Sequence, residues 1–532
     1  MKDSFYRTMN WLHTWVGLLV CWLLLLIFFS GTLSYYRYAI NLWMKPELHQ
    51  NVIQSYNPKN IVQIIDFGQA YLEQHASNAA KWYINFPTER KPYLSYAWQL
   101  AAQENQKRGK YIEHIVTTDN HIIDQVRASK GGHFFYRLHF DLHYLPTSIS
   151  RWIVGFCTMF MLIALISGIV IHKRIFKDFF SFRPNKGARS WLDAHNVSSV
   201  FALPYHLMIT YTGLIAIMFS LMPWGLNSVY EGGRQALNND INPNNSMPRA
   251  SGITQPLINL STILPMLDNV WNEPTLKSIT IINPNDSNSR IIAELNNQQD
   301  LTEQEHRVVI NGISGQLVST PQSLGAILAT HDTLLALHTG RFAEPILRAM
   351  FFISGILGCT MIATGTIMWA VKIRKKQQKQ LITGASPSLG LRIVESLNLG
   401  VIAGLPLATA AFFITNRMLP ASLTERYDIE INSFFSVLLL TILISFWRND
   451  RQAWCKLLWL NSISFAFLPI LNSLTSPTNL LSNIKMMQWQ LVGFDIMCLI
   501  FAVMSGFAAI QLKKRTSRIP KKRSLNLQEH PL

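Results

Sequence analysis

Histidine is the residue type whose placement in this sequence could support chemistry. Fifteen histidines occur in 532 residues, and several collect at the ends of long apolar runs. Imidazole is the usual axial ligand for haem iron, and haem b needs no CxxCH attachment motif, which the sequence lacks. Copper and zinc sites generally use three or four clustered ligands. The candidate cofactor-binding residues are His13, His172 and His195 at one end of these runs, His139, His143 and His338 at the other, and His206 within a run.

Two of these histidines recur at the same distance from a glycine. His13 lies 18 residues before Gly31, and His195 lies 18 residues before Gly213. A haem iron with two axial nitrogens needs one histidine from each of two facing helices. The shared spacing predicts that His13 and His195 stand on equivalent helices and ligate one haem iron.

A second pair is expected at the opposite end of the apolar runs. His338 aligns with Asp141, midway between His139 and His143. We expect His338 and His143 to ligate a second haem iron, with His139, about one helical turn earlier, as the equally open alternative.

Two further histidines break this pattern. His206 follows His195 by 11 residues, which on one continuous helix leaves them within roughly 20° of one face and about 16 Å apart. His206 aligns with Leu24 and His172 with Trp369, so neither has an equivalent in the other half. Both a haem contact and a hydrogen bond to a helix carbonyl remain open for His206, and an interfacial position remains open for His172.

The composition identifies the elements that must position these residues as membrane helices. The chain is 49% hydrophobic and 14% charged, against about 25% charged in soluble proteins. Its formal charge is +17, but the basic residues cluster directly after apolar runs, at 173–189, 372–379 and 513–523. That pattern is typical of cytoplasmic loops and excludes a nucleic-acid surface. The five cysteines form no CxxC pair, so neither a disulfide framework nor a zinc site is indicated.

The apolar runs predict about eight transmembrane helices. Each is long enough for the roughly 20 residues that span a bilayer. The expected spans are 11–37, 149–172, 196–222, 346–371, 396–416, 432–447, 454–472 and 490–511. The first is too long for a signal peptide and lacks a cleavage site. The basic loops then place both termini in the cytoplasm.

Two long polar insertions, 38–148 and 223–345, interrupt this series on the external side. Each opens with an extended, turn-rich stretch, followed by a helix (61–75 and 257–270) and then by β-branched runs, which predicts two small α+β domains. The unit span–domain–span thus occurs twice as a tandem parallel repeat. The expected organisation is repeat one at 1–172, a cytoplasmic loop at 173–195, repeat two at 196–372, a linker at 373–395, a four-helix extension at 396–512 and a basic tail at 513–532.

Several motifs together resemble one known family. They are 11–17 (WLHTWVG), 136–143 (YRLHFDLH), 336–341 (ALHTGR), 202–213 (ALPYHLMITYTG) and the segment 168–184, with the Ser/Thr-Gly ends of the spans. The chain resembles the PepSY-associated transmembrane family over about 1–372, which includes inner-membrane, haem-containing siderophore reductases. At the start of the third span, the family's usual His-Arg-x-x-Gly is replaced by His195-Asn-Val-Ser-Ser.

The resemblance implies a bacterial inner-membrane protein with PepSY-like periplasmic domains and two haem b groups. It implies an oxidoreductase that transfers electrons from the cytoplasmic side to periplasmic ferric iron or a ferric siderophore. Reduction weakens binding by hard oxygen ligands, because Fe(II) is the softer ion. The cytoplasmic loops contain no GxGxxG fingerprint. A donor protein or a quinol is therefore expected as partner, together with membrane lipid and no nucleic acid.

Two other functions stay open on the sequence alone. The external domains could bind or regulate periplasmic proteins or peptides, with the spans as an anchor and no redox activity. A transporter is the other alternative, although the last four spans offer only Glu395 and Asp495 as acids. Neither alternative explains histidines in registered layers.

Overall fold

The computed structural model divides into two compact units. One comprises Met1–Phe182 and Ala194–Ile362, and the other comprises Arg183–Asp193 and Ala363–Leu532. Residues 173–182 and 184–185 of the expected basic loop, and the expected tail from residue 518, lie outside the described residues. The described residues are 2–51, 60–104, 109–117, 119–123, 125–172, 183, 186–233, 236–237, 248–271, 275–296, 301, 306–320 and 325–517.

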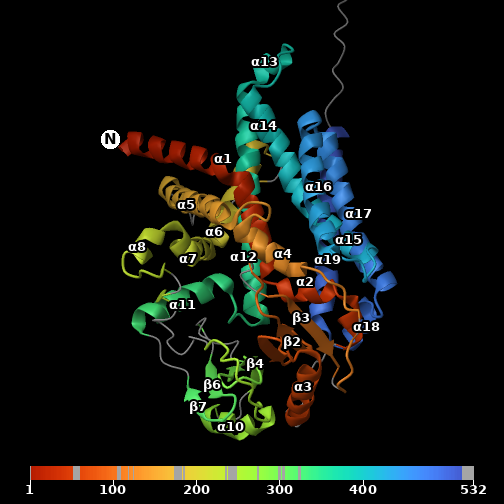
Figure 1. The fold of residues 1–532 in the computed structure, drawn as a ribbon. Helices are drawn as coiled ribbons and strands as arrows, with labels where there is room; N and C mark the ends of the chain where they lie inside the picture. The colour runs from red at the N-terminus through yellow and green to blue at the C-terminus, as the bar shows by residue number, and fades with distance from the viewer. Residues whose placement is uncertain are drawn as a thin grey trace, which may run out of the picture. The chain divides into compact units, whose positions relative to one another are not determined.

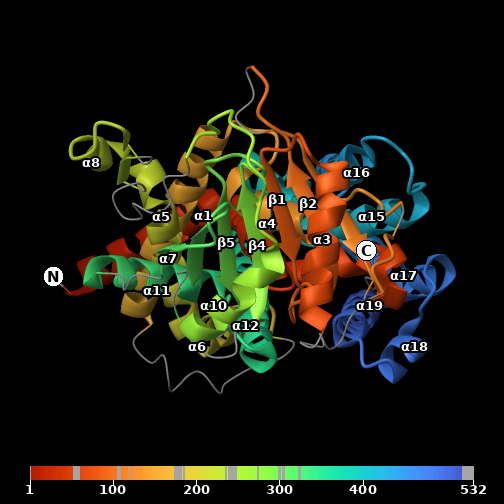
Figure 2. The same ribbon diagram turned by 60° about the horizontal axis from the view of Figure 1, so that its bottom comes forward.

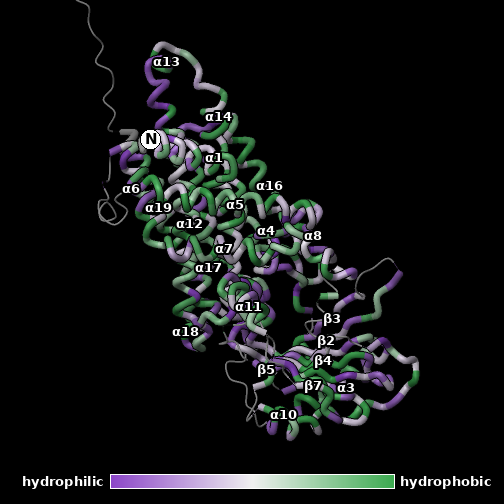
Figure 3. Tube along the Cα trace, turned by 90° about the vertical axis from the view of Figure 1, so that its left-hand side faces the viewer, coloured by the Kyte–Doolittle hydropathy of each residue, from purple (hydrophilic) through white to green (hydrophobic). Residues whose placement is uncertain are grey.

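Helices long and apolar enough to cross a membrane number eight within the described residues, as the sequence predicted. The protein is therefore a multi-pass membrane protein, and Figure 3 shows the hydrophobic colouring along its long helices. The eight segments are α1 (Lys2–Ser34), α5 (Thr147–Ile171), α7 (Leu203–Leu221), α12 (Pro345–Lys376), a composite segment Leu389–Met418, α16 (Arg426–Trp447), α17 (Arg451–Thr475) and α19 (Trp489–Ser517).

The third span is interrupted where the sequence predicted one helix over 196–222. The chain forms α6 (Ala188–Phe201), leaves helical geometry at Ala202 and resumes as α7. Pro204 stands in the first turn of α7. A proline has no N–H to donate and its ring clashes with the carbonyl four residues earlier, which ends the preceding helix. His195 and His206 therefore belong to different helices, and the prediction that both stand on one face of a continuous helix was wrong.

Shorter helices surround the spans of the first unit (Figure 1). Two of them carry candidate site histidines, His139 on α4 (Gly131–Asp141) and His338 on α11 (Ala326–Thr339). Helix α4 packs against α1 and α5, and α11 packs against α7. α1 also packs against α5, and α5 against α7. Further short helices of this unit include α2 (Arg37–Trp43), η1 (Pro46–Asn51) and α8 (Pro223–Asn227).

The strands of both insertions form a single antiparallel sheet, where the sequence predicted a small sheet in each. Its order is β3-β2-β1-β4-β5-β6-β7. At the junction β1 and β4 pair directly, with Tyr83 opposite Thr280 and Ile84 opposite Ile279 (Figure 2). The strands are β1 (Lys81–Asn85), β2 (Leu94–Gln99), β3 (Tyr111–Val116), β4 (Leu276–Ile282), β5 (Arg290–Leu295), β6 (Arg307–Asn311) and β7 (Leu317–Ser319).

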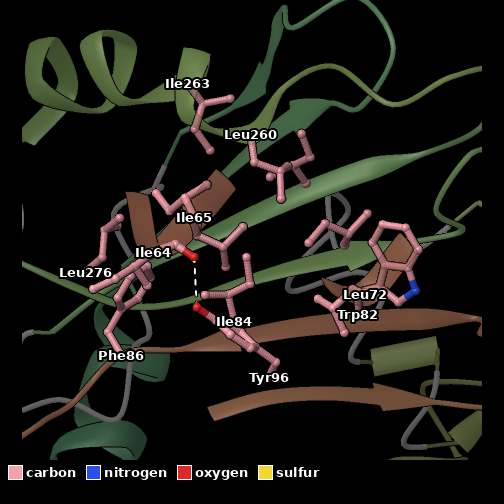
Figure 4. Packing of buried hydrophobic residues seen from close by; sticks show 14 of the residues in the cluster. Ile64, Ile65, Leu72, Trp82, Ile84, Phe86, Tyr96, Leu260, Ile263 and Leu276 are labelled. Atoms are coloured by element: carbon pink, nitrogen blue, oxygen red, sulfur yellow. Dashed lines mark hydrogen bonds between the residues drawn. The ribbon is translucent and has the colours of Figure 1, made fainter. Parts of the chain in front are cut away.

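One hydrophobic core covers the joined sheet. Helix α3 (Ile61–His75) contributes Ile65 and Leu72, while η4 (Leu260–Ile263) and α10 (Leu264–Trp271) cover the second half of the same face. Figure 4 shows these side chains packed over the strands, with the Tyr96 hydroxyl donating to the Ile64 carbonyl at 2.9 Å. Because both insertions share this core, the two predicted domains fold as one.

The second unit consists of the last helices. The segment Leu389–Met418 runs through α14 (Leu389–Leu397), a π-helical turn η5 (Asn398–Ala403) and α15 (Gly404–Met418). A Cβ at Gly400 would lie 2.8 Å from the Ile442 Cα, so glycine permits the close approach to α16. The unit is completed by α13 (Gln378–Ile382) and α18 (Leu480–Lys485).

The two acids that could have favoured a transporter both have partners in this unit. The Glu395 carboxylate accepts two hydrogen bonds of 2.6 Å from Arg374. The Asp495 carboxylate accepts from the Asn472 amide at 3.0 Å. Neither acid therefore needs a transported ion to account for its position.

Candidate functional site

The two histidines of the first half (residues 1–172) that lie in the site, His13 and His139, share one hydrogen-bonding arrangement. The Nδ1 atom of His13, on α1, lies 2.8 Å from the Ala164 carbonyl oxygen of α5. The Nδ1 atom of His139, on α4, lies 2.7 Å from the Ile27 carbonyl oxygen of α1. A carbonyl only accepts, so each Nδ1 carries the proton and donates.

The second half repeats the arrangement. The Nδ1 atom of His195, on α6, lies 2.8 Å from the Met361 carbonyl oxygen of α12. The Nδ1 atom of His338, on α11, lies 3.1 Å from the Ile209 carbonyl oxygen of α7. With Nδ1 protonated in all four rings, Nε2 keeps its lone pair for a metal ion.

The four histidines meet in two pairs. The ring centroids of His13 and His195 are 6.3 Å apart, with an interplanar angle of 74°. Those of His139 and His338 are 6.0 Å apart, at 29°. Each pair takes one histidine from each half of the first unit, as the sequence predicted for His13 and His195.

Glycines open the helix surface where the rings pack. A Cβ at Gly31 would lie 2.7 Å from the Cε1 and Nδ1 atoms of His139. At Gly168 it would lie 3.2 Å from Cε1 of His13, and at Gly213 it would lie 3.0 Å from Cε1 of His338. The glycine spacing seen in the sequence therefore marks places where an imidazole lies against a bare helix backbone.

His143 does not join the outer pair, contrary to its expected pairing with His338. Helix α4 ends at Asp141, and both Leu142 and His143 have left-handed backbone angles, with φ of 48° and 49°. This turn directs His143 to the surface, where its ring lies near Phe134 and Tyr144. Of the two candidates, His139 is thus the one whose ring lies beside that of His338.

His172 and His206 stand apart from both pairs. His172 directly follows the last residue of α5 as its C-cap, and its backbone N–H donates to the Gly168 carbonyl at 3.1 Å. His206 is fully buried, with Nε2 3.3 Å from the Ser354 carbonyl oxygen and its ring 6.3 Å from that of Phe28. No ring contact joins either residue to another histidine in the part of the chain that the structure describes.

Some features of the site could not be recognised from residue types. The acceptors Ala164, Met361, Ile27 and Ile209 act through backbone carbonyls, so their side chains give no signal. The regular spacing of the glycines was visible in the sequence, but it did not reveal that they contact histidine rings. Within the described ranges, no group of three or more His, Cys, Asp or Glu side chains is placed to hold a metal ion.

Comparison with known proteins agrees with the architecture of the first unit. No curated protein matches the chain. The family model described as the PepSY-associated TM region matches residues 10–372, which include both histidine pairs, the joined sheet and the first four spans. Since that match covers well over half of the sequence, the chain belongs to the PepSY-associated transmembrane family.

Proposed function

We propose that this protein transfers electrons across the membrane through two haem b groups. His13 and His195 would hold one, and His139 and His338 the other. The observation that carries the proposal is the separation of the paired rings, 6.3 and 6.0 Å. A bond of about 2 Å from each Nε2 to the metal, plus about 1 Å from each nitrogen to its ring centre, places two axial imidazole centroids about 6 Å apart.

The surroundings of the rings also fit a haem ligand set. Each Nδ1–H is tied to a backbone carbonyl, the arrangement that fixes the tautomer and orientation of metal-bound histidines and raises their basicity. The described residues provide no hydrogen bond to any of the four Nε2 atoms. A haem iron with two axial imidazoles supplies reversible one-electron transfer when bound.

The two pairs lie at different depths of α1. His13 belongs to the inner pair, while the outer His139 donates to Ile27, about four helical turns further along the same helix. Four turns of α-helix extend about 21 Å, a large part of the roughly 30 Å hydrocarbon core. This spacing supports transfer from one face of the membrane toward the other.

A tandem repeat would explain why the site is built twice. The shift in numbering that relates the acceptor Ala164 to Met361 is the same shift that relates Arg151 to Arg348. Likewise, the acceptors Ile27 and Ile209 are separated by the same length of chain as His13 and His195. The histidine pairs would then lie on the pseudo-twofold axis between the halves.

The sheet supports the same repeat independently. The shift in numbering from the start of β2 to the start of β5 equals the shift from β3 to β6. The same shift relates Tyr83 to Ile279 and Ile84 to Thr280. In the sheet, Tyr83 pairs with Thr280 and Ile84 pairs with Ile279, so the two pairs are equivalent under this shift. The two insertions would be PepSY-like domains related by that axis.

The direction of transfer follows from the basic loops. Lys and Arg after the second, fourth and eighth spans favour a cytoplasmic position for these loops and for both termini. The sheet would then lie in the periplasm of an inner-membrane protein. Ferric iron or a ferric siderophore would accept the electrons there, and a donor protein or a quinol would supply them inside.

Visible absorption of the detergent-purified protein tests this function. Protein from haem-replete cells should show a b-type spectrum with six-coordinate, low-spin iron, because both axial positions are filled by imidazole. Adding ferric citrate to the reduced protein should restore the oxidised spectrum. A colourless protein, or a reduced spectrum that ferric chelates leave unchanged, would instead favour an anchored domain that binds periplasmic proteins.

The variant His206→Leu should retain both haems. Its Nε2 donates to the Ser354 carbonyl and its ring lies near Phe28, so the change removes about one hydrogen bond, worth roughly 1 kcal/mol. Haem content per protein and a redox titration measure the result, with His338→Leu as the comparison that should lose one haem. Loss of a haem in the His206 variant would assign it a ligand role.

A further inference from the structure

Four arginines converge on the turn that follows the outer histidine His338. Helix α11 ends at Thr339, and the turn after it exposes the carbonyls of Gly340 and Ala343. The Arg90 guanidinium, from the loop between β1 and β2, donates through Nη2 to the Gly340 carbonyl at 3.1 Å, to that of Arg341, and to the Ala343 carbonyl at 3.3 Å. This cation is thus held beside the segment that carries His338.

A second guanidinium shares one of these acceptors. Arg348 Nη2 lies 3.1 Å from the Ala343 carbonyl oxygen and 3.4 Å from the Glu89 carboxylate. The Glu89 side chain is 56% exposed, so water screens its charge. Two like charges therefore meet at one carbonyl with weak compensation.

Arg37 and Arg341 complete this arginine cluster, and the pKa of the neighbouring Tyr38 is lowered by its positive charge. Arg37 Nη2 donates to the Tyr38 hydroxyl at 2.8 Å. Burial raises the pKa of Tyr38, but the charges of Arg37, Arg341 and Arg90 outweigh it and the pKa falls below its ordinary value. Burial, with the charge of Arg348 next, lowers the pKa of Arg90 to about 10.

The corresponding position in the first half holds a buried acid. There Arg151, the counterpart of Arg348, lies 3.3 Å from the buried Asp141, which also pairs with Arg137. The shift in numbering that relates Arg151 to Arg348 places His338 at the position of Asp141. The numbering position of the acid that pairs with Arg151 is therefore occupied by His338, and Arg37 and Arg90 bring further positive charge near Arg348.

Unsatisfied donors point to an absent acceptor in the same place. The buried Nε atoms of Arg90 and Arg348 have no hydrogen-bond partner among the described residues. Buried polar groups in native proteins nearly always have a partner, which here would be a water molecule or an anion. The segments 37–38, 88–93 and 340–348 together contain four arginines and two acids, Glu89 and Glu344.

We propose that Arg37, Arg90, Arg341 and Arg348 form a binding site for an anionic, oxygen-ligated ferric chelate beside the outer histidine pair. Guanidinium groups bind carboxylate and similar oxygen anions through paired, charge-assisted hydrogen bonds. Arg341 is exposed and provides access, whereas the other three are partly buried. As a reduction site it depends on the proposed function, but as a binding site it does not.

Calorimetric titration with Ga(III) citrate tests the binding step. This redox-inert analogue of an anionic ferric chelate is titrated into the full-length protein in detergent, so the result does not depend on haem. Arg90→Gln and Arg341→Gln should each weaken binding about tenfold, because each removes a charge-assisted contact. The control Arg137→Gln removes the same charge beside Asp141, which keeps its ion pair with Arg151, and should change affinity less than about twofold.

A kinetic measurement assigns the effect to the substrate. The reduced protein is mixed with anionic ferric citrate and with a cationic trihydroxamate ferric chelate. Both cluster variants should slow oxidation by the anionic chelate about tenfold and leave the cationic one unchanged. Arg341→Gln alters an exposed side chain, so it keeps the test valid if Arg90→Gln disturbs the turn after His338.

Three outcomes would overturn the proposal. The first is that the wild-type protein fails to bind Ga(III) citrate, whether or not its absorption spectrum shows haem. Equal slowing with both chelates would place the arginines' effect on electron transfer rather than on the substrate. Native mass spectrometry that finds phosphatidylglycerol retained by the wild type, lost in Arg90→Gln and not displaced by Ga(III) citrate would identify a lipid headgroup site. Arginine-dependent binding by a colourless protein would support this site and contradict the proposed function.

Discussion

Replacing either His13 or His195 by Ala is expected to remove the same haem from the protein. The two rings form one pair, 6.3 Å between centroids, so either change would leave the proposed haem iron without one of its two imidazole ligands. Haem content should fall by about half in each single variant. The double variant should lose no more, because residues that act as a unit are not additive.

The measurement is haem per protein in the pyridine haemochrome assay, combined with redox titration. His143→Ala serves as the control, since that imidazole lies at the surface outside both pairs. A double variant with clearly less haem than either single variant would mean that His13 and His195 do not share an iron.

Replacing Gly31 by Leu should remove the outer haem without changing any ligand. A Cβ at this position would lie 2.7 Å from two atoms of the His139 ring. The ring cannot retreat without losing its hydrogen bond to Ile27. We expect haem content to fall by about half and oxidation by ferric citrate to slow at least about tenfold, because a small misplacement of a ligand set is costly.

The matched control is Gly17→Leu on the same helix. A Cβ at Gly17 meets no atom within 4 Å, so that variant should keep both haems. Both changes replace Gly by Leu in α1, and they therefore alter helix propensity equally. Equal haem contents in the two variants would contradict the packing of His139 on Gly31.

The membrane-spanning helices were predictable because they depend on a local property. An apolar run of about 20 residues specifies a span without reference to the rest of the chain. The interruption at Ala202 depends on one proline within such a run, and hydropathy does not register it. Because the run 196–222 is predominantly apolar, the sequence suggested one helix.

The histidine pairs were only partly predictable. The closeness of His13 and His195 was predictable from their equal spacing to Gly31 and Gly213, although these glycines contact the rings of His139 and His338. The choice of His139 over His143 depends on the left-handed turn after Asp141, which no glycine or asparagine announces at residues 142 and 143. The carbonyl acceptors could not be predicted, because every residue carries one and only tertiary packing selects it.

The joined sheet lay beyond sequence reasoning for a related reason. Alternation of polar and apolar residues predicts strands but does not specify which strands are neighbours. β1 and β4 belong to different insertions, far apart in the chain, and their pairing is a tertiary event. The arginine cluster was missed likewise, since Arg90 and Arg341 come from different insertions.

The pairing of β1 with β4 has a consequence for how the two halves are held together. The two strands run antiparallel, and corresponding residues of β1 and β4 occupy corresponding places in the pairing: Tyr83 lies opposite Thr280, and Ile84 lies opposite Ile279. Two identical subunits of a symmetric homodimer make the same kind of self-complementary contact. Here a single polypeptide makes that contact with itself, so the strands meet at an effective concentration set by the chain and not by expression level. Dilution in a large membrane area cannot separate them, and the histidine pairs drawn from opposite halves keep their partners at any abundance.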